Sequence, residues 1–176
     1  MPIDMKSMIA GTFLDLAKQK EIDKITVKAL IEACHISRQT FYYHFQDMMD
    51  VIAWSMEQAA RAMLERGLKA GTPEEAFSII LSSAAENHQL IRKLMNSQKR
   101  DQVEKLFVQM IKKYIQELIL NKAPELSLNY SDMELLLDFW AFGITGILFQ
   151  HCIEERTDAQ KLARQICRLL SERPKS

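Results

Sequence analysis

Two neighbouring residues, Arg38 and Gln39, have side chains that can pair with the edges of DNA bases. Arginine can bind guanine O6 and N7, and glutamine can pair with adenine. Threonine, tyrosine and histidine carry donors that suit phosphate oxygens, and phosphate contacts position a protein without specifying sequence. Such donors follow the pair at Thr40, Tyr42, Tyr43 and His44. The segment therefore predicts contact with nucleic acid.

Two short helices joined by a tight turn would position these side chains, as in a helix-turn-helix that places its second helix in the major groove. Thr26 and Ser37 each have the form of a helix N-cap. The apolar residues Ile36, Phe41 and Phe45 can pack on the first helix, and residues four apart share a helix face. We expect the outward positions to be Arg38, Gln39, Tyr42 and Tyr43, with Thr40 and His44 at the flanks. The N–H groups that follow Ser37 favour a phosphate.

An ordinary small helix with aromatic core residues is the alternative, and spacing alone leaves the two interpretations about even. The string Ile25-Thr26-Val27, then Ala33, then Ile36 to Phe45 resembles the DNA-binding region of TetR-family bacterial regulators. The resemblance covers roughly the first 50 residues, and the distance of the motif from the N-terminus also agrees with the family. It implies a three-helix DNA-binding head, an all-helical regulatory body, a homodimer and a palindromic operator.

The resemblance also implies roles for individual residues. Contacts to the DNA backbone are implied for Thr26, Lys28, Ser37, Thr40, Tyr42 and His44. Base contacts are implied for Arg38, Gln39 and Tyr43.

Three departures from the family pattern bear on DNA affinity. The turn position that usually holds glycine is His35, a residue type that tolerates left-handed geometry better than most. The fourth helix commonly starts with a phosphate-binding lysine, whereas this chain has Asp47-Met48-Met49-Asp50. Residues 1–50 hold six basic and seven acidic side chains, so the head has a formal charge of −1. Because affinity depends largely on phosphate neutralisation, we expect modest, strongly salt-sensitive binding by each head.

The whole chain of 176 residues predicts an all-α fold of about nine helices, because helical spacing recurs from end to end and strand patterns are nearly absent. Boundaries are predicted at 1–46 for the DNA-binding domain and 47–176 for the regulatory and dimerisation domain. Beyond the head, Asp47 has the form of an N-cap, and capping-box spacings predict three later helix starts. Those starts are Thr72-Pro73 with Glu75, Ser131 with Glu134, and Thr157 with Gln160.

Composition favours a binding protein over an enzyme. The three cysteines, Cys34, Cys152 and Cys167, are too few and too scattered for a disulfide framework or zinc finger, and they fit a reducing cytoplasm. The apolar segment Leu135–Phe149 is shorter than the ~20 residues of a membrane span. We find no phosphate-binding glycine loop, metal-ligand string or paired carboxylates, so no catalytic residue, metal or cofactor is expected.

The C-terminal part predicts a dimer interface. The segment Phe139–Phe149 is apolar almost all round, and Gly143 and Gly146 cost helix stability unless they allow close approach of backbones. The segment resembles a C-terminal subtype of the same family, which implies a four-helix interface made by the last two helices of each subunit. A monomer core helix is the alternative. The predicted interface residues are Trp140, Gly143, Ile144, Ile147, Leu148, His151, Leu162, Ile166 and Leu169.

An effector pocket between the long helices is a further hypothesis, although a stripe of such residues is more often plain core. The residues that would line it are Trp54, Met63, Phe77, Met95, Phe107, Met110 and Tyr114. The head and the C-terminal pattern are also similar to the group that controls dihydroxyacetone kinase operons. This similarity does not identify an effector.

The sequence thus predicts a cytoplasmic, homodimeric repressor. The alternative is an adaptor that acts mainly through a protein partner and binds DNA weakly.

Overall fold

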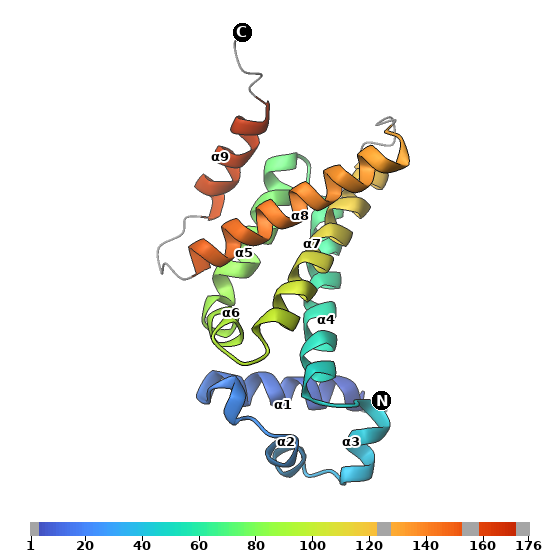
Figure 1. Ribbon diagram of the computed structural model, residues 1–176, viewed down its shortest axis with the longest axis vertical. Helices are drawn as coiled ribbons and strands as arrows, with labels where there is room; N and C mark the ends of the chain where they lie inside the picture. Colours follow the sequence, from blue (N-terminus) through green and yellow to red (C-terminus); the bar gives the residue numbers. More distant parts are fainter. Residues whose placement is uncertain (1–3, 123–127, 153–158, 172–176) are drawn as a thin grey trace. The chain divides into compact units, whose positions relative to one another are not determined.

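The computed structural model describes residues 4–122, 128–152 and 159–171. Over these ranges the chain forms nine α-helices and one short 3-10 helix, with no strand, which confirms the predicted all-α class (Figure 1). In the same ranges no helix is long and apolar enough to cross a membrane. The elements are α1 Met5–Gln19, η1 Ile22–Lys24, α2 Val27–Cys34, α3 Arg38–His44, α4 Met48–Lys69, α5 Pro73–Glu86, α6 His88–Met95, α7 Arg100–Lys122, α8 Tyr130–Cys152 and α9 Ala159–Ser171.

The chain divides into two compact units that are not the two halves of the sequence. The first unit joins Met1–Ala59 to Lys93–Leu106, and the second joins Ala60–Arg92 to Phe107–Ser176. The first unit contains the whole of the predicted DNA-binding domain, 1–46. It also contains the end of α6 and the start of α7, which lie far away along the sequence. The boundary between residues 46 and 47 stays a prediction.

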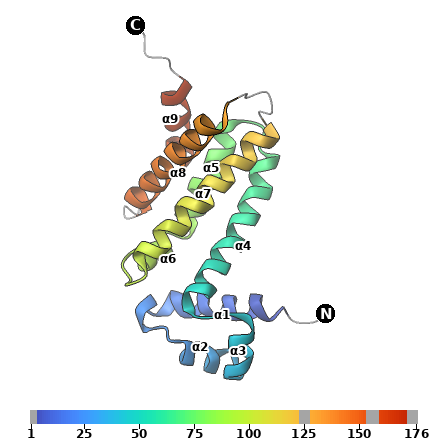
Figure 2. The same ribbon diagram turned by 45° about the vertical axis from the view of Figure 1, so that its right-hand side comes forward.

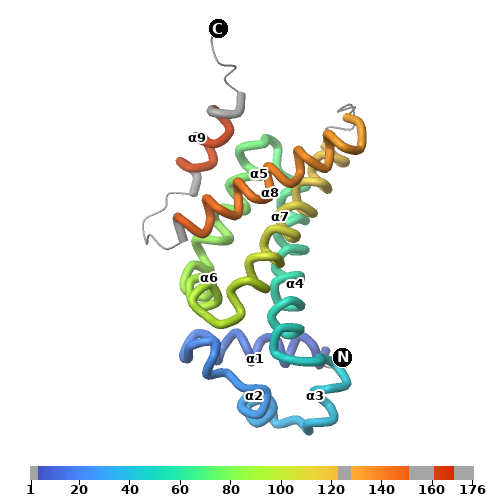
Figure 3. The backbone as a smooth tube through the Cα atoms, viewed as in Figure 1, coloured from blue at the N-terminus to red at the C-terminus, as the bar shows by residue number. Residues whose placement is uncertain are grey.

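The first unit is built around α1. Helix α2 packs against α1 and α3 packs against α2, so that α2 and α3 lie on the same side of α1 in two views of the ribbon and in the backbone trace (Figures 1, 2 and 3). Large apolar side chains from all three helices are fully buried at this junction. They are Ile9, Phe13, Leu30, Phe41 and Phe45. Burial of these side chains is the main favourable term that holds three short helices together.

Side chains at the helix starts explain where α2 and α3 begin. The Thr26 hydroxyl accepts the Ala29 N–H at 3.1 Å, and the Ser37 hydroxyl accepts the Thr40 N–H at 2.9 Å. Both predicted N-caps are therefore confirmed. Between the helices His35 adopts the left-handed conformation, with φ 53° and ψ 39°, in the position where the family usually has glycine. The turn is thus kept with a residue that accepts this geometry at some cost.

Of the N-caps predicted for the later helices, two are confirmed and one is wrong. The Asp50 N–H donates to the Asp47 carboxylate at 2.9 Å, and the Glu75 N–H donates to the Thr72 hydroxyl at 3.2 Å, so these two caps are confirmed. The predicted cap at Ser131 was wrong. The cap lies two residues earlier, because the Asn129 side chain accepts the Asp132 N–H at 2.9 Å, and helix α8 begins at Tyr130. The predicted cap at Thr157 lies outside the described residues.

The second unit packs α9 and α8 against α5. The Phe77 and Trp140 rings join α5 to α8, with centroids 5.5 Å apart. Lys112 on α7 donates to the carboxylates of Glu134 and Asp138 on α8, at 2.8 Å and 2.7 Å. Glu134, expected in a capping box, is therefore used to join two helices.

Helices α4, α5 and α7 meet within the second unit at the Tyr114 side chain. The Tyr114 hydroxyl donates to the Ala76 carbonyl at 3.1 Å, and burial raises the pKa of Tyr114 to about 12. The ring lies against the backbone of Gly67, where an added Cβ would overlap the Tyr114 hydroxyl. Gly67 is thus required by the close approach of a ring that is fixed by its own hydrogen bond.

We predict that Gly67→Ala destabilises the protein by about 1–3 kcal/mol, because the new methyl group overpacks the site around Tyr114. Gly11→Ala is the matched control, since the Cβ position at Gly11 is open and alanine favours the helix. Urea unfolding of both variants measures the effect. Equal stability of the two variants would contradict the close packing at Gly67.

Candidate nucleic-acid interface

Two phenylalanines fix which face of α3 points outward. Phe41 and Phe45 expose 0% and 1% of their surface. Phe41 contacts Phe45 with ring centroids 6.2 Å apart, and Phe45 contacts the edge of Trp54 at 6.1 Å. Since these rings anchor one side of the helix in the core of the first unit, the opposite side must face solvent.

The outward side of α3 carries the residues that the sequence placed there. Arg38, Gln39, Tyr42 and Tyr43 are exposed, and Thr40 and His44 at the flanks are half-buried. Tyr43 is 85% exposed, which leaves most of an aromatic ring in water with only the edge-on ring of His44 beside it, at 4.9 Å. Tyrosine is enriched at interfaces, because its ring can bury apolar area while its hydroxyl forms a hydrogen bond.

Two hydroxyls at the start of α3 are partly occupied by the helix itself. Ser37 Oγ accepts the Thr40 N–H, and the Ser37 and Thr40 hydroxyls share a hydrogen bond of 2.8 Å. One hydroxyl hydrogen is used between them, so the other can donate to a phosphate oxygen. Thr26 is exposed and caps α2, so the hydroxyl groups of both helix starts face solvent in the first unit.

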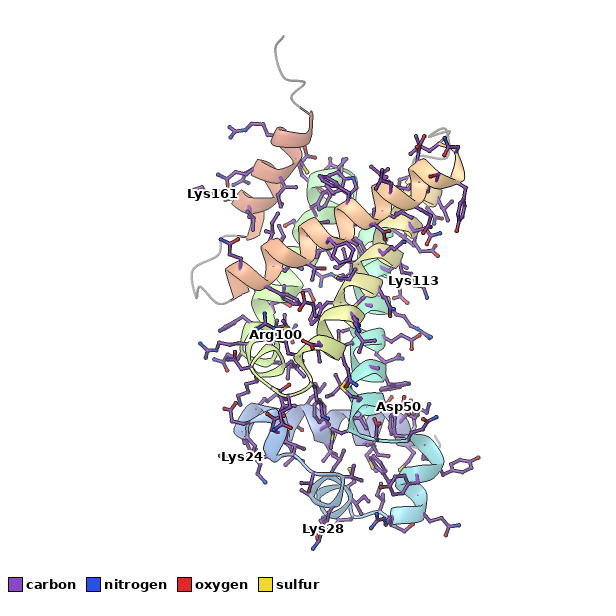
Figure 4. All side chains as sticks on the ribbon, in the orientation of Figure 1. Lys24, Lys28, Asp50, Arg100, Lys113 and Lys161 are labelled. Carbon is purple, nitrogen blue, oxygen red and sulfur yellow. The ribbon has the colours of Figure 1, made fainter. Side chains whose placement is uncertain are left out.

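Lys28 supplies a cation on α2. Figure 4 shows its side chain projecting from α2 on the side away from α1. Its ammonium lies 4.0 Å from the Glu32 carboxylate, and both side chains are mostly exposed. Exposed pairs of this kind contribute little, so the Lys28 ammonium can exchange this partner for a phosphate.

Acidic groups lie near the same surface. The Ser7 hydroxyl hydrogen-bonds to Asp4 and lowers the pKa of that carboxyl, and nearby His44 adds a smaller lowering. Lys6 lies over the Phe45 ring, with its ammonium 5.3 Å from the ring centroid. Lys6 is not among the predicted DNA-binding residues, because no local sequence pattern indicates that the start of α1 lies near the end of α3.

Comparison with known proteins agrees with this geometry. Residues 71–172, more than half of the chain, match the family described as "Transcriptional regulator C-terminal region". Residues 14–53 match "Bacterial regulatory proteins, tetR family", and they contain α2, α3 and their caps. The chain belongs to the TetR family. It is therefore a transcriptional regulator with a DNA-binding helix-turn-helix, and not an enzyme.

Relatives extend this similarity over nearly the whole chain. The HTH-type dhaKLM operon transcriptional activator DhaS of Lactococcus lactis subsp. lactis (strain IL1403) is 23% identical over 167 residues, covering 94% of this chain and 88% of that protein.

Solved structures share the fold. The dihydroxyacetone kinase operon activator DhaS has a TM-score of 0.71 at 21% identity, covering 96% of this chain and 94% of that one. Lin0861 from Listeria innocua has a TM-score of 0.71 at 19% identity, covering 97% and 96%. The TetR-family repressor AlkX from Dietzia sp. strain DQ12-45-1b has a TM-score of 0.62 at 16% identity, covering 93% and 94%.

The residues predicted for a TetR-family dimer interface fall into different environments. Ile144 and Leu148 are buried within their own chain, and Trp140 packs on Phe77. Gly143 is exposed, whereas Ile147, Leu162 and Ile166 are half-buried. The side chains of His151 and Leu169 lie outside the described residues. Part of the predicted set is thus already used inside one subunit.

A separate stripe of α8 is apolar and exposed. Leu135, Phe139 and Phe142 are 71%, 69% and 64% exposed, and Gly143 and Gly146 have open space where a Cβ would be. Their spacing of four, three, one and three residues keeps them on one helix face. The predicted segment Phe139–Phe149 includes Phe139, Phe142 and both glycines, but the predicted interface residues include none of the three large side chains.

The residues expected to line an effector pocket are divided between the two units. Trp54 and Met95 belong to the first unit, and Met63, Phe77, Phe107, Met110 and Tyr114 belong to the second. Phe107 contacts the edge of the Phe149 ring at 5.1 Å, so this side chain has a packing role of its own. The pocket stays a prediction.

Two long-range polar contacts attach the α6–α7 segment to the head. The Lys93 ammonium donates to the carbonyls of Ala17, Lys18 and Lys20 at 2.7, 3.1 and 3.1 Å. The Asp23 carboxylate accepts the Gln98 N–H, which lies 3.2 Å from both oxygens. We call these two sets of contacts together the Lys93–Asp23 clamp, although Lys93 and Asp23 do not pair with each other. Lys93 satisfies carbonyls at the C-terminal end of α1, where the helix dipole also favours a cation.

We predict that Lys93→Met, which keeps the apolar stem and removes the ammonium, lowers the free energy of unfolding by about 1 kcal/mol. Amide exchange should also quicken in the last turn of α1, where the carbonyls lose their partner. Lys105→Met is the matched control, because Lys105 is exposed on α7 in the same unit. Identical behaviour of the two variants would show that the clamp contributes nothing.

Proposed function

We propose that this regulator binds a palindromic operator as a homodimer, with α3 of each subunit in the major groove. The observation that carries the proposal is the outward face of α3. Its direction is set by Phe41 and Phe45, whose rings are buried on the opposite side of the helix. Base contacts are assigned to Arg38, Gln39 and Tyr43, and backbone contacts to Thr26, Lys28, Ser37, Thr40, Tyr42 and His44. All nine residues lie on α2, α3 or their N-caps.

The exposed stripe of α8 supports the proposed dimer. An isolated subunit would keep Leu135, Phe139 and Phe142 in water next to two glycines that leave the backbone uncovered. Burying this stripe against its copy on a second subunit removes the apolar area from water. The two glycines then allow close approach of the two helices. A two-fold protein also matches a two-fold operator, with recognition helices about 34 Å apart.

The relatives do not decide whether this protein activates or represses transcription. DhaS is named an activator and AlkX a repressor, so the expected role as a repressor stays a prediction. Control by an effector in the body would work by shifting the population of the DNA-competent form. The alternative function, an adaptor that acts through a protein partner, draws support from the head, where acidic side chains outnumber basic ones by one in residues 1–50.

We expect the purified protein to enrich a palindrome from a random DNA pool at moderate salt, and Arg38→Ala to lose that enrichment because a base-reading group is gone. Lys113→Ala is the matched control, since Lys113 is an exposed cation on α7 in the second unit and is not one of the nine assigned contact residues. Enrichment of no sequence by the wild type would favour the adaptor function.

We expect Phe142→Glu to yield a monomer in sedimentation velocity, because a charge would lie in the centre of the proposed interface. Phe142 is 64% exposed, so the fold of one subunit does not depend on its burial. Tyr130→Glu is the matched control, since Tyr130 is 83% exposed on the same helix but lies off the stripe. A dimer that survives Phe142→Glu would place the interface elsewhere.

A further inference from the structure

Arg38 and Tyr42 form a cation–π pair on the outward face of α3. They are four residues apart, so their side chains lie one above the other on the helix. The guanidinium carbon of Arg38 is 5.5 Å from the centroid of the Tyr42 ring. A cation at this distance from a ring is attracted by the ring's quadrupole.

The Tyr42 ring also contacts the Phe41 ring. The two rings meet edge-on, at an interplanar angle of 90° and a centroid distance of 5.3 Å. Phe41 is fully buried, whereas Tyr42 is 47% exposed. The Tyr42 ring therefore lies between a buried ring of the first unit and a charged group in solvent.

The cation–π contact leaves the donors of Arg38 free. Among the residues that the structure describes, none accepts a hydrogen bond from the Arg38 guanidinium, so its five N–H groups are available. In the described part of the chain Arg38 forms no ion pair with a carboxylate, in contrast to Lys28, which has Glu32. The donor fork that binds guanine O6 and N7 is thus both held in place and unoccupied.

We propose that Tyr42 is a positioning residue for sequence recognition, because its ring holds the Arg38 guanidinium for a bidentate contact with guanine. This inference rests on the proposed operator binding and deepens it. The resemblance to the family implies a contact of Tyr42 with the DNA backbone. The pair on α3 assigns a separate task to the ring, namely to reduce the rotamer freedom that Arg38 loses on binding.

The test uses the full-length protein and the operator selected by the wild type. Each guanine of a half-site is replaced in turn by 7-deazaguanine, which lacks the N7 acceptor. The ratio of the two dissociation constants, modified over unmodified, measures readout at that base. One position should give a large ratio for the wild type and a ratio near one for Arg38→Ala, and this position identifies the guanine that Arg38 contacts.

At that position Tyr42→Phe should keep the wild-type ratio, because the ring remains. Tyr42→Leu should lower the ratio by about two- to fivefold, the range expected for loss of an exposed cation–π contact. In the Arg38→Ala background Tyr42→Leu should no longer change the ratio. Thermal unfolding of each variant serves as the folding control, and Tyr42→Leu is expected to fold because Tyr42 is half exposed.

Other outcomes overturn the inference. If Tyr42→Phe and Tyr42→Leu weaken binding to all fragments equally and leave the ratio unchanged, Tyr42 only contacts the backbone. If no guanine is sensitive to Arg38→Ala, Arg38 is not a guanine reader and the ring has nothing to position. If the wild type selects no sequence, the proposed function itself fails, and this inference fails with it.

Discussion

The seating of Phe41 and Phe45 in the first unit is the constraint on which the DNA-binding surface depends. Helix α3 has only seven residues, too few to be stable in water without tertiary packing. Its axial rotation is therefore set by the two buried rings, and a small rotation would turn Arg38 and Tyr43 away together. The Ser37 cap fixes where the helix starts, and the left-handed His35 fixes the angle at which the chain enters it. Recognition chemistry on the outside is thus a consequence of apolar packing on the inside.

The Lys93–Asp23 clamp adds a second constraint on the same unit, from a distant part of the sequence. Lys93 and Gln98 belong to the segment around the α6–α7 turn, and their partners lie at the end of α1 and in η1. Charge-assisted hydrogen bonds are stronger than neutral ones and depend on geometry. A shift of α6 by a few ångströms would break all of them at once, so the position of this segment is coupled to the end of α1. The link requires no contact with DNA or with an effector.

Local features were predictable from the sequence, and long-range ones were not. Thr26, Ser37 and Thr72 were identified as caps because a cap depends on residues within three positions. The start at Ser131 failed because Asn129 competes for the same role two residues earlier. Helix α8 is apolar on most sides, so hydrophobicity could not distinguish Ile144, buried in its own subunit, from Phe142, left in solvent. The Lys93 contacts span more than 70 residues and have no local signal.

The acidic balance of the head has a structural explanation. At the start of α4 the Asp47 carboxylate accepts the Asp50 N–H, and the Asp50 carboxylate accepts the Gln46 N–H at 3.0 Å. These carboxylates occupy the backbone donors that a helix start could otherwise offer to a phosphate. Phosphate neutralisation by each head would then depend on a few lysines such as Lys28. In the proposed dimer we therefore expect each head to bind weakly and the two linked heads to gain by effective concentration. The proposed dimerisation and the expected salt sensitivity are then linked, because a head that binds weakly alone would make occupancy of the operator depend on the pairing of two subunits.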